Sequence, residues 1–168
     1  MDETSLSVDL PYPVTLEKCG AKTVSIWTTG HERTSFTVIL GCLADGRKLP
    51  AVCIFKLKNI PREIFPEGVV IRVNAKGWCN EEEMKYWISN VWSERSELES
   101  PQSLLILDSF RGHLVDPVKC RFHENNTHTV VIPGGLTSKL QPLDVAINKC
   151  FKEKVQYIKI GFIVYRAY

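Results

Sequence analysis

Several features that would identify a class of protein are missing from this sequence. Its 168 residues contain no apolar run near the roughly 18 residues that a membrane-spanning helix needs, and the first residues do not have the pattern of a signal peptide. There is no internal repeat and no low-complexity segment. No GxxxxGK[ST] motif follows Gly134-Gly135, so this pair indicates a break after a strand better than a phosphate-binding loop.

Charge and cysteine content indicate no particular partner either. The chain has 21 basic and 19 acidic residues and a net charge of +2, which is too balanced to indicate nucleic acid. Its six cysteines are widely spaced and form no CxxC pair. This spacing argues against a zinc site and favours reduced thiols in an intracellular protein. The 44% of hydrophobic residues is ordinary for one soluble globular domain.

The chain is organised around residues 103–108, in which four aliphatic residues lead to Asp108. Bounded by Pro101 and Gly112, this run predicts a strand buried on both faces at the centre of a parallel or mixed sheet. Open α/β sheets place their chemistry at the carboxyl ends of such strands. Asp108 has an alternative role of equal weight, because an aspartate there can cap the following turn through an Asx interaction.

Other strands are predicted mainly in the amino-terminal half. Residues 5–20 contain two prolines and Gly20 and predict a loop. Asp45-Gly46 predicts a hairpin turn, because such turns demand a positive φ. Alternation and β-branched residues predict strands at residues 23–27, 35–43, 51–55, 69–73 and 127–132.

One helix is especially well marked. Asn80 can cap it, and Glu83 three residues later completes a capping box. One apolar face is then formed by Met84, Trp87, Ile88, Val91 and Trp92. The two tryptophans on this face are expected in the core rather than on a base-stacking surface. Further helices are predicted at residues 114–125 and from Leu143 onward.

The last of these helices carries polar residues at a regular spacing. Asp144, Asn148 and Lys152 recur every four residues and so project from the same face. Taken alone, Asp144 is better explained as an N-cap residue that follows the turn at Pro142.

Three stretches together resemble the acidic motifs of the pogo/Tigger transposases, which are DDE superfamily endonucleases of the mariner-like group. They are MDET at residues 1–4, LILDSFRGH at residues 105–113 and IPGGLTSKLQPLD at residues 132–144. The third is long and specific, whereas the first alone carries no weight. The resemblance runs to about Val155 and implies an α/β fold of the ribonuclease-H-like type, a mixed sheet flanked by helices.

The resemblance also sets expectations for the chain's organisation. In the family an apolar strand precedes the first acid, whereas Met1 alone precedes Asp2 here, so the first strand is expected to be truncated. The alternative for Asp2 is a solvated chain end. We expect a DDE endonuclease domain over residues 1–158 and a divergent tail over residues 159–168. The DNA-targeting helix-turn-helix of a sequence-specific transposase is absent from this sequence.

For the chemistry, the resemblance implies that Asp2, Asp108 and Asp144 are both the catalytic residues and the ligands of Mg²⁺ or Mn²⁺. Such ions take oxygen ligands, and a pair of them can activate water and neutralise charge at a phosphodiester. It also implies a nuclear protein that acts on DNA. The expected DNA contacts are Ser109, His113, Lys139, Gln141, Asn148 and Lys152. A local hydrogen bond for His113 and a solvated face for the lysines are the more ordinary explanations.

Two functions remain open from the sequence. The first is a DDE-type endonuclease that performs two-metal phosphodiester cleavage or strand transfer, which the survival of all three acids favours. The second is a domesticated, catalytically inactive module that binds nucleic acid or protein, which the truncated first strand and the divergent tail favour. The sequence leaves equally open whether the chain forms a homodimer.

Overall fold

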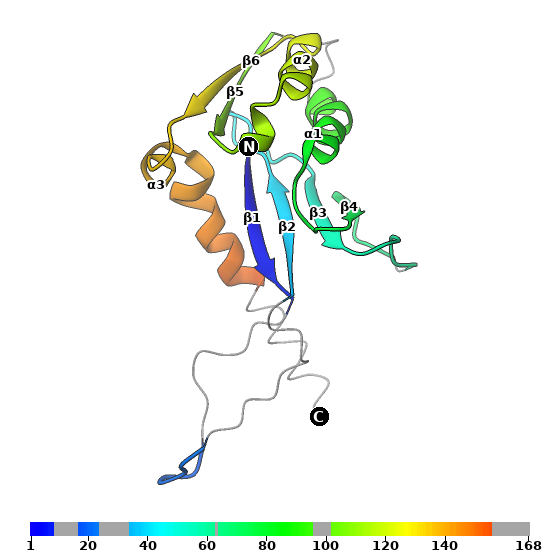
Figure 1. The fold of residues 1–168 in the computed structure, drawn as a ribbon. Coiled ribbons are helices and arrows are strands. Elements are labelled where there is room, and N and C mark those ends of the chain that lie inside the picture. Colours follow the sequence, from blue (N-terminus) through cyan, green and yellow to red (C-terminus); the bar gives the residue numbers. More distant parts are fainter. Residues whose placement is uncertain (9–16, 24–33, 63, 96–101, 156–168) are drawn as a thin grey trace.

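A computed structural model of the chain describes residues 1–8, 17–23, 34–62, 64–95 and 102–155, which form a mixed α/β structure (Figure 1). The predicted strand at residues 23–27 falls almost entirely outside the described residues, as do the domain end at residue 158 and the tail. Within the described ranges, no helix combines the length and the apolar character that crossing a membrane requires.

The larger sheet contains four strands in chain order. They are β1 (Asp2–Ser7), β2 (Ser35–Leu40), β3 (Ala51–Lys56) and β4 (Val69–Asn74). The pairs β1–β2 and β2–β3 are antiparallel, and β3–β4 is parallel. The predicted hairpin turn between β2 and β3 is confirmed, since Gly46 has a φ of 89° that favours glycine.

The first strand differs from its prediction. A loop was expected from residue 5, but β1 continues to Ser7, so that expectation is wrong for residues 5–7. The strand is polar, and its pairing with β2, from Asp2 opposite Leu40 to Ser7 opposite Ser35, holds it in place. Asp2 is therefore the first residue of β1, and the rest of the strand follows it in the sequence.

The smaller sheet pairs β5 (Ser103–Asp108) in parallel with β6 (Thr127–Ile132). The Met1 backbone nitrogen donates to the Ile106 carbonyl oxygen at 2.9 Å and so links β1 to β5. Burial on both faces of β5 is a wrong prediction, because Leu104 and Ile106 are 61% and 39% exposed. The core packs against the other face of β5 and leaves this one open. Among the described strands, β5 belongs to a two-stranded sheet with β6 and does not lie at a sheet centre.

The well-marked helix is confirmed as α1 (Glu81–Trp87), which continues into the π-helical turn η1 (Ile88–Trp92) and the short 3₁₀ turn η2 (Ser93–Arg95). Asn80 is its N-cap, with Oδ1 accepting from the Glu83 backbone nitrogen at 3.0 Å. The Glu83 carboxylate accepts from Arg72 Nε at 2.8 Å, so it serves β4 in place of the predicted capping box.

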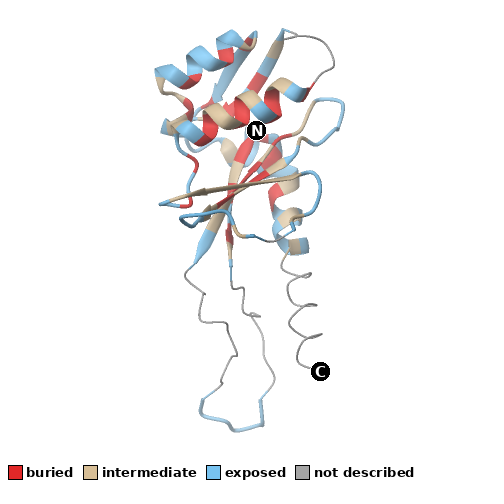
Figure 2. Cartoon of the chain, turned by 90° about the vertical axis from the view of Figure 1, so that its right-hand side faces the viewer, coloured by how far each residue is buried: buried red, intermediate tan, exposed pale blue. Residues whose placement is uncertain are grey.

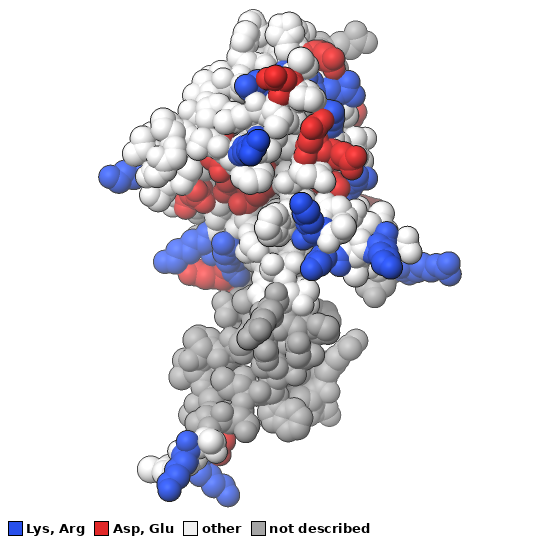
Figure 3. Space-filling model, viewed as in Figure 1, with Lys and Arg blue, Asp and Glu red and all other residues white. Residues whose placement is uncertain are grey.

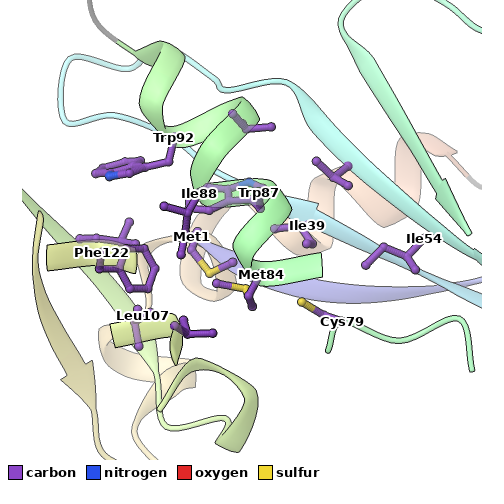
Figure 4. Packing of buried hydrophobic residues seen from close by; sticks show 14 residues of the cluster. Met1, Ile39, Ile54, Cys79, Met84, Trp87, Ile88, Trp92, Leu107 and Phe122 are labelled. Carbon is purple, nitrogen blue, oxygen red and sulfur yellow. The ribbon is translucent and has the colours of Figure 1, made fainter. Parts of the chain in front are cut away.

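The core lies between these helices and the strands, as the distribution of buried residues shows (Figure 2). The predicted apolar face is confirmed, because all five of its side chains are buried. Trp87 and Trp92 stack with ring centroids 5.8 Å apart. Figure 4 shows them packed near Met1, Leu107 and Phe122, so one cluster joins both sheets. This packing holds the start of β1 close to β5.

The remaining helices follow β5 and β6. Between these strands lie the 3₁₀ turn η3 (Arg111–His113) and α2 (Asp116–Glu124), the latter confirming the predicted helix. After β6 come the short α3 (Thr137–Leu140) and the π-helical turn η4 (Leu143–Ile147), which continues as helix over residues 148–155. This last helix runs beside β1 (Figure 1).

The helix from Leu143 is therefore confirmed, but the capping role considered for Asp144 is not. Pro142 occupies the N-cap position of η4 without a side-chain capping hydrogen bond, and the Asp144 carboxylate accepts from the side chain of Asn148 one turn later. Asp144 is thus turned toward Asn148 rather than toward the end of its own helix.

Candidate functional site

Acidic side chains converge from two directions on the start of β1. Asp2 and Glu3 are neighbours in the strand, so their side chains point to opposite faces of the sheet. Asp2 meets the last helix, whereas Glu3 meets η3 on the other face. Figure 3 shows acidic side chains gathered near the start of β1 and the last helix, with basic side chains around them.

On the first face, two amide side chains hold Asp2. Asn148 Nδ2 donates to Asp2 Oδ2 at 2.5 Å and to Asp144 Oδ1 at 2.9 Å. Gln141 Nε2 donates to Asp2 Oδ1 at 3.3 Å and to the Met1 carbonyl oxygen at 2.9 Å. We call Asp2, Gln141, Asp144 and Asn148 the amide-held group. It joins the first strand to the last helix.

The surroundings of Asp2 oppose its ionisation. Burial is the largest effect and raises the pKa of Asp2, and the negative charges of Asp144 and Glu3 raise it further. The hydrogen bonds from Asn148 and Gln141 act in the opposite direction but do not cancel the rise. The pKa of this carboxyl therefore lies above its ordinary value, because removing it from water penalises the charged form.

On the second face, His113 stands between two carboxylates. Its Nε2 lies 2.6 Å from Glu3 Oε1, and its Nδ1 lies 2.9 Å from Asp108 Oδ1, an ion-pair distance without hydrogen-bond alignment. Asp108 Oδ1 also accepts from the Phe110 backbone nitrogen at 3.0 Å, so the Asx interaction considered for Asp108 is present. We call Glu3, Asp108 and His113 the imidazole-held group.

Charge decides the protonation of His113. Its burial lowers the pKa, but the hydrogen bond and charge of Glu3, together with the charge of Asp108, outweigh burial and raise the pKa above its ordinary value. An imidazolium can donate through Nε2 to Glu3 and attract the nearby Asp108 carboxylate by its charge. The His113 side chain hydrogen-bonds to Glu3, a residue distant in sequence.

The three predicted metal ligands are divided between these groups. Asp2 and Asp144 share the Asn148 amide, whereas Asp108 lies with His113 and Glu3. Among the residues that the structure describes, one set of three His, Cys, Asp or Glu residues has ligand atoms within 4.8 Å of one another, and it is the imidazole-held group. Glu3 was not among the predicted site residues, because only strand pairing shows which face it occupies.

The predicted DNA contacts also divide into two kinds. Ser109, Lys139 and Lys152 are exposed. His113, Gln141 and Asn148 are buried and hold acidic side chains in place. The three buried side chains therefore orient carboxylates, whereas the other three face solvent.

The donor set fits a hard divalent cation. Gln141 Oε1 and Asn148 Oδ1 are buried and have no hydrogen-bond partner within the described part of the chain. They lie in the same group as the carboxylates of Asp2 and Asp144. Carboxylate and amide oxygens are the ligands that Mg²⁺ and Ca²⁺ take in proteins. The chemistry of these residues is therefore compatible with a cation at this face.

Two-metal sites serve phosphatases, polymerases and nucleases, and carboxylates are among the ligands that Mg²⁺ takes. The family whose pattern matches this chain is described as DDE superfamily endonuclease, and the match covers residues 33–160. The chain therefore belongs to this family. The matched range includes Asp108 and Asp144 and begins after Asp2.

The similar curated proteins identify the domain as pogo-type, which confirms the resemblance. The human protein "Pogo transposable element with KRAB domain" is 42% identical over 156 residues, which is 92% of this chain and 26% of that protein. Its mouse counterpart is 41% identical over the same length. The human "Pogo transposable element with ZNF domain" is 28% identical over 152 residues, 90% of this chain and 11% of that protein.

The chain spans about a quarter of the length of the first two of these relatives. No solved structure matches it.

Proposed function

We propose that this chain is a DNA-acting DDE-type endonuclease domain with a ribonuclease-H-like fold, which cleaves or transfers phosphodiesters in the nucleus with Mg²⁺ or Mn²⁺. The observation that carries this proposal is the amide-held group. Asp2 from the first strand and Asp144 from the last helix share one amide donor, in a group with two buried amide oxygens that have no partner among the described residues. Membership of the DDE family supports the same chemistry.

In this proposal Asp2, Asp108 and Asp144 are the metal ligands. A bound divalent cation neutralises charge at the phosphate and lowers the pKa of a bound water. The protein's other side chains orient these acids. Asn148 and Gln141 hold Asp2, and His113, itself held by Glu3, limits the rotation of Asp108.

The exposed residues would bind the DNA backbone. Ser109 directly follows Asp108, and Lys139 and Lys152 lie near the two ends of the segment that contains Asp144. Lysines that contact phosphates release counterions, so their contribution to binding falls as the salt concentration rises.

The test is thermal unfolding in EDTA, Mg²⁺ and Mn²⁺, on the chain and on Asp108→Asn. A ligand that binds only the folded protein raises its melting temperature. We expect both cations to raise the melting temperature of the wild type, and to raise the melting temperature of Asp108→Asn by a smaller amount. Asp116→Asn is the matched control, because the Asp116 side chain is 95% exposed.

The same preparations are then assayed for nicking of supercoiled plasmid with Mn²⁺. Nicking by the wild type and by Asp116→Asn, but not by Asp108→Asn, supports the endonuclease. A cooperative transition that neither cation moves, together with no nicking, contradicts it.

A second function is favoured by one observation. Asp108 lies in a separate group from Asp2 and Asp144, and its partners are His113 and Glu3. A domesticated module that binds nucleic acid or protein without catalysis can keep such an arrangement. In that case Asp108→Asn binds DNA as tightly as the wild type in EDTA, and neither protein nicks plasmid.

A further inference from the structure

The orientation of the Asn148 amide is dictated by its neighbours. Both carboxylates that face it are acceptors, so the amide must present its nitrogen to them, because its oxygen would repel them. Nδ2 uses its two protons in this way, one toward Asp2 and one toward Asp144. Asn148 is 7% exposed, whereas Asp144 is exposed, so the amide is buried between one buried and one exposed carboxylate.

This orientation turns the other end of the amide away from both carboxylates, where no described residue pairs with it. Asn148 Oδ1 is buried and accepts no hydrogen bond from the described residues. The same holds for Gln141 Oε1, whose nitrogen also faces Asp2. A buried acceptor without a partner is costly, so the hydrogen bonds that the nitrogens donate to the carboxylates must outweigh this cost for the amides to keep their orientation.

The amide is also an incomplete partner for two carboxylates. It is neutral, whereas Asp2 is buried and the charge of Asp144 adds to the cost of ionising it. Asn148 therefore keeps the two acids side by side without cancelling their charge.

We propose that Asn148 is a positioning residue that bridges Asp2 and Asp144 in the metal-free protein, and that a divalent cation takes over this bridging when it binds. The replacement of the bridge by a cation rests on the proposed function, whereas the bridge in the metal-free protein rests on the hydrogen bonds of Asn148 alone. The proposal assigns Asn148 a role inside the site instead of a contact with DNA.

The experiment compares the melting temperatures of four proteins in EDTA and in saturating Mn²⁺. They are the wild type, Asn148→Ala, Asn148→Asp and the control Lys152→Ala. Lys152 lies one turn further along the same helix face and is exposed. Mn²⁺ binding to each protein is followed in parallel by electron paramagnetic resonance of the free ion, a readout that does not depend on catalysis.

In EDTA we expect Asn148→Ala to melt about 3 °C or more below the wild type, a shift that corresponds to about 1 kcal/mol in a protein of this size. Asn148→Asp is expected to melt lower still, because it places a third carboxylate beside the other two. Lys152→Ala is expected to melt with the wild type.

The increase in melting temperature on adding Mn²⁺ is expected to be largest for the variants that melt lowest in EDTA. Asn148→Asp should gain most and bind Mn²⁺ more tightly than the wild type, and Asn148→Ala should gain more than the wild type, because the cation supplies the bridge that each has lost. Should Asn148→Ala show no cooperative transition in EDTA, Mn²⁺ must restore one. A variant that stays unfolded with the cation overturns the proposal, as does an equal Mn²⁺ gain in all four proteins.

Failure of the bridge and failure of the proposed function give different results. If Mn²⁺ stabilises the wild type but Asn148→Ala and the wild type melt together in EDTA, the metal site stands and the bridge is wrong. If the EDTA order holds but Mn²⁺ moves none of the four proteins, the bridge stands in the metal-free protein, while the proposed metal site and the replacement by a cation are both wrong.

Discussion

The amide-held and imidazole-held groups begin at consecutive residues of one strand and stabilise acidic side chains in different ways. Asp2 is held by two neutral amides, which donate hydrogen bonds but bring no charge. Glu3 is held by His113, which can carry a positive charge and share it with Asp108. The first group therefore has no positive charge of its own, whereas in the second one imidazolium offsets one of the two carboxylate charges.

The difference also concerns what each group contributes to folding. A buried ion pair is costly to break from one side, because the remaining charge is left in a low-dielectric environment. Removing a neutral hydrogen-bond donor costs less free energy of folding than removing a charged partner. The imidazole-held group should therefore dominate the stability of the metal-free protein, and the amide-held group should dominate its response to metal.

The largest expected effect is that of His113→Ala. This change leaves Glu3 and Asp108 without their shared partner and opens a cavity where the buried imidazole lies. We expect a loss of about 3 kcal/mol in the free energy of unfolding, measured by urea denaturation in EDTA. His123→Ala, on the exposed side of α2, is the control and should change stability little. A His113→Ala protein as stable as that control would remove the contrast between the two groups.

The second prediction concerns pH in the absence of metal. Because the folded protein raises the pKa of His113 above its ordinary 6.5, the stabilisation from the imidazolium is complete below about pH 6.5. It is lost as pH rises through the folded-state pKa. The stability difference between the wild type and His113→Gln should therefore shrink as pH rises above 6.5.

Asp2 titrates in another window with the same sign. Its pKa is raised above 3.8, so its contribution is greatest below that pH and falls as pH rises through the folded-state pKa. The contribution of Asp2 is measured by urea denaturation of Asp2→Asn and the wild type at a series of pH values from 4 upward. A difference that stays constant with pH for both variants shows that neither group titrates as described.

The smallest effects are expected when the same substitution, aspartate to asparagine, is made in each group. These two variants compare the groups most directly. At pH 7 in EDTA, Asp2→Asn removes a charge that burial disfavours, so stability should be unchanged or rise by up to about 1 kcal/mol. Asp108→Asn removes a charge that faces His113, so stability should fall by about 1 kcal/mol. Urea denaturation measures both changes in stability. If both substitutions destabilise the protein, or both stabilise it, the distinction between the amide-held and imidazole-held groups is contradicted.

Local sequence patterns predicted much of the fold. The Asn80 cap, the Asp45-Gly46 turn and the strand at residues 127–132 all appear where they were expected. Each depends on backbone preferences or on hydrogen bonds between residues close in sequence. The same patterns failed for residues 5–7, whose polar strand exists because β2 lies beside it.

The site was predicted less completely. Motifs pointed to Asp2, Asp108 and Asp144, and their role as ligands stays a prediction. Motifs did not point to Glu3, and they placed Gln141 and Asn148 on DNA, whereas the structure buries both against Asp2. Nothing near an amide in sequence reports whether it faces water or a distant carboxylate.

By itself, the sequence determined the Asn80 cap, the Asp45-Gly46 turn, most of the strands and the family of this protein, because those follow from short-range backbone chemistry and motif spacing. Only the tertiary structure decided that Asp2 meets an amide and Glu3 an imidazole, and that one face of β5 stays open. Those outcomes depend on how the first strand packs against segments more than a hundred residues away, where burial and charge act between groups that no local pattern relates.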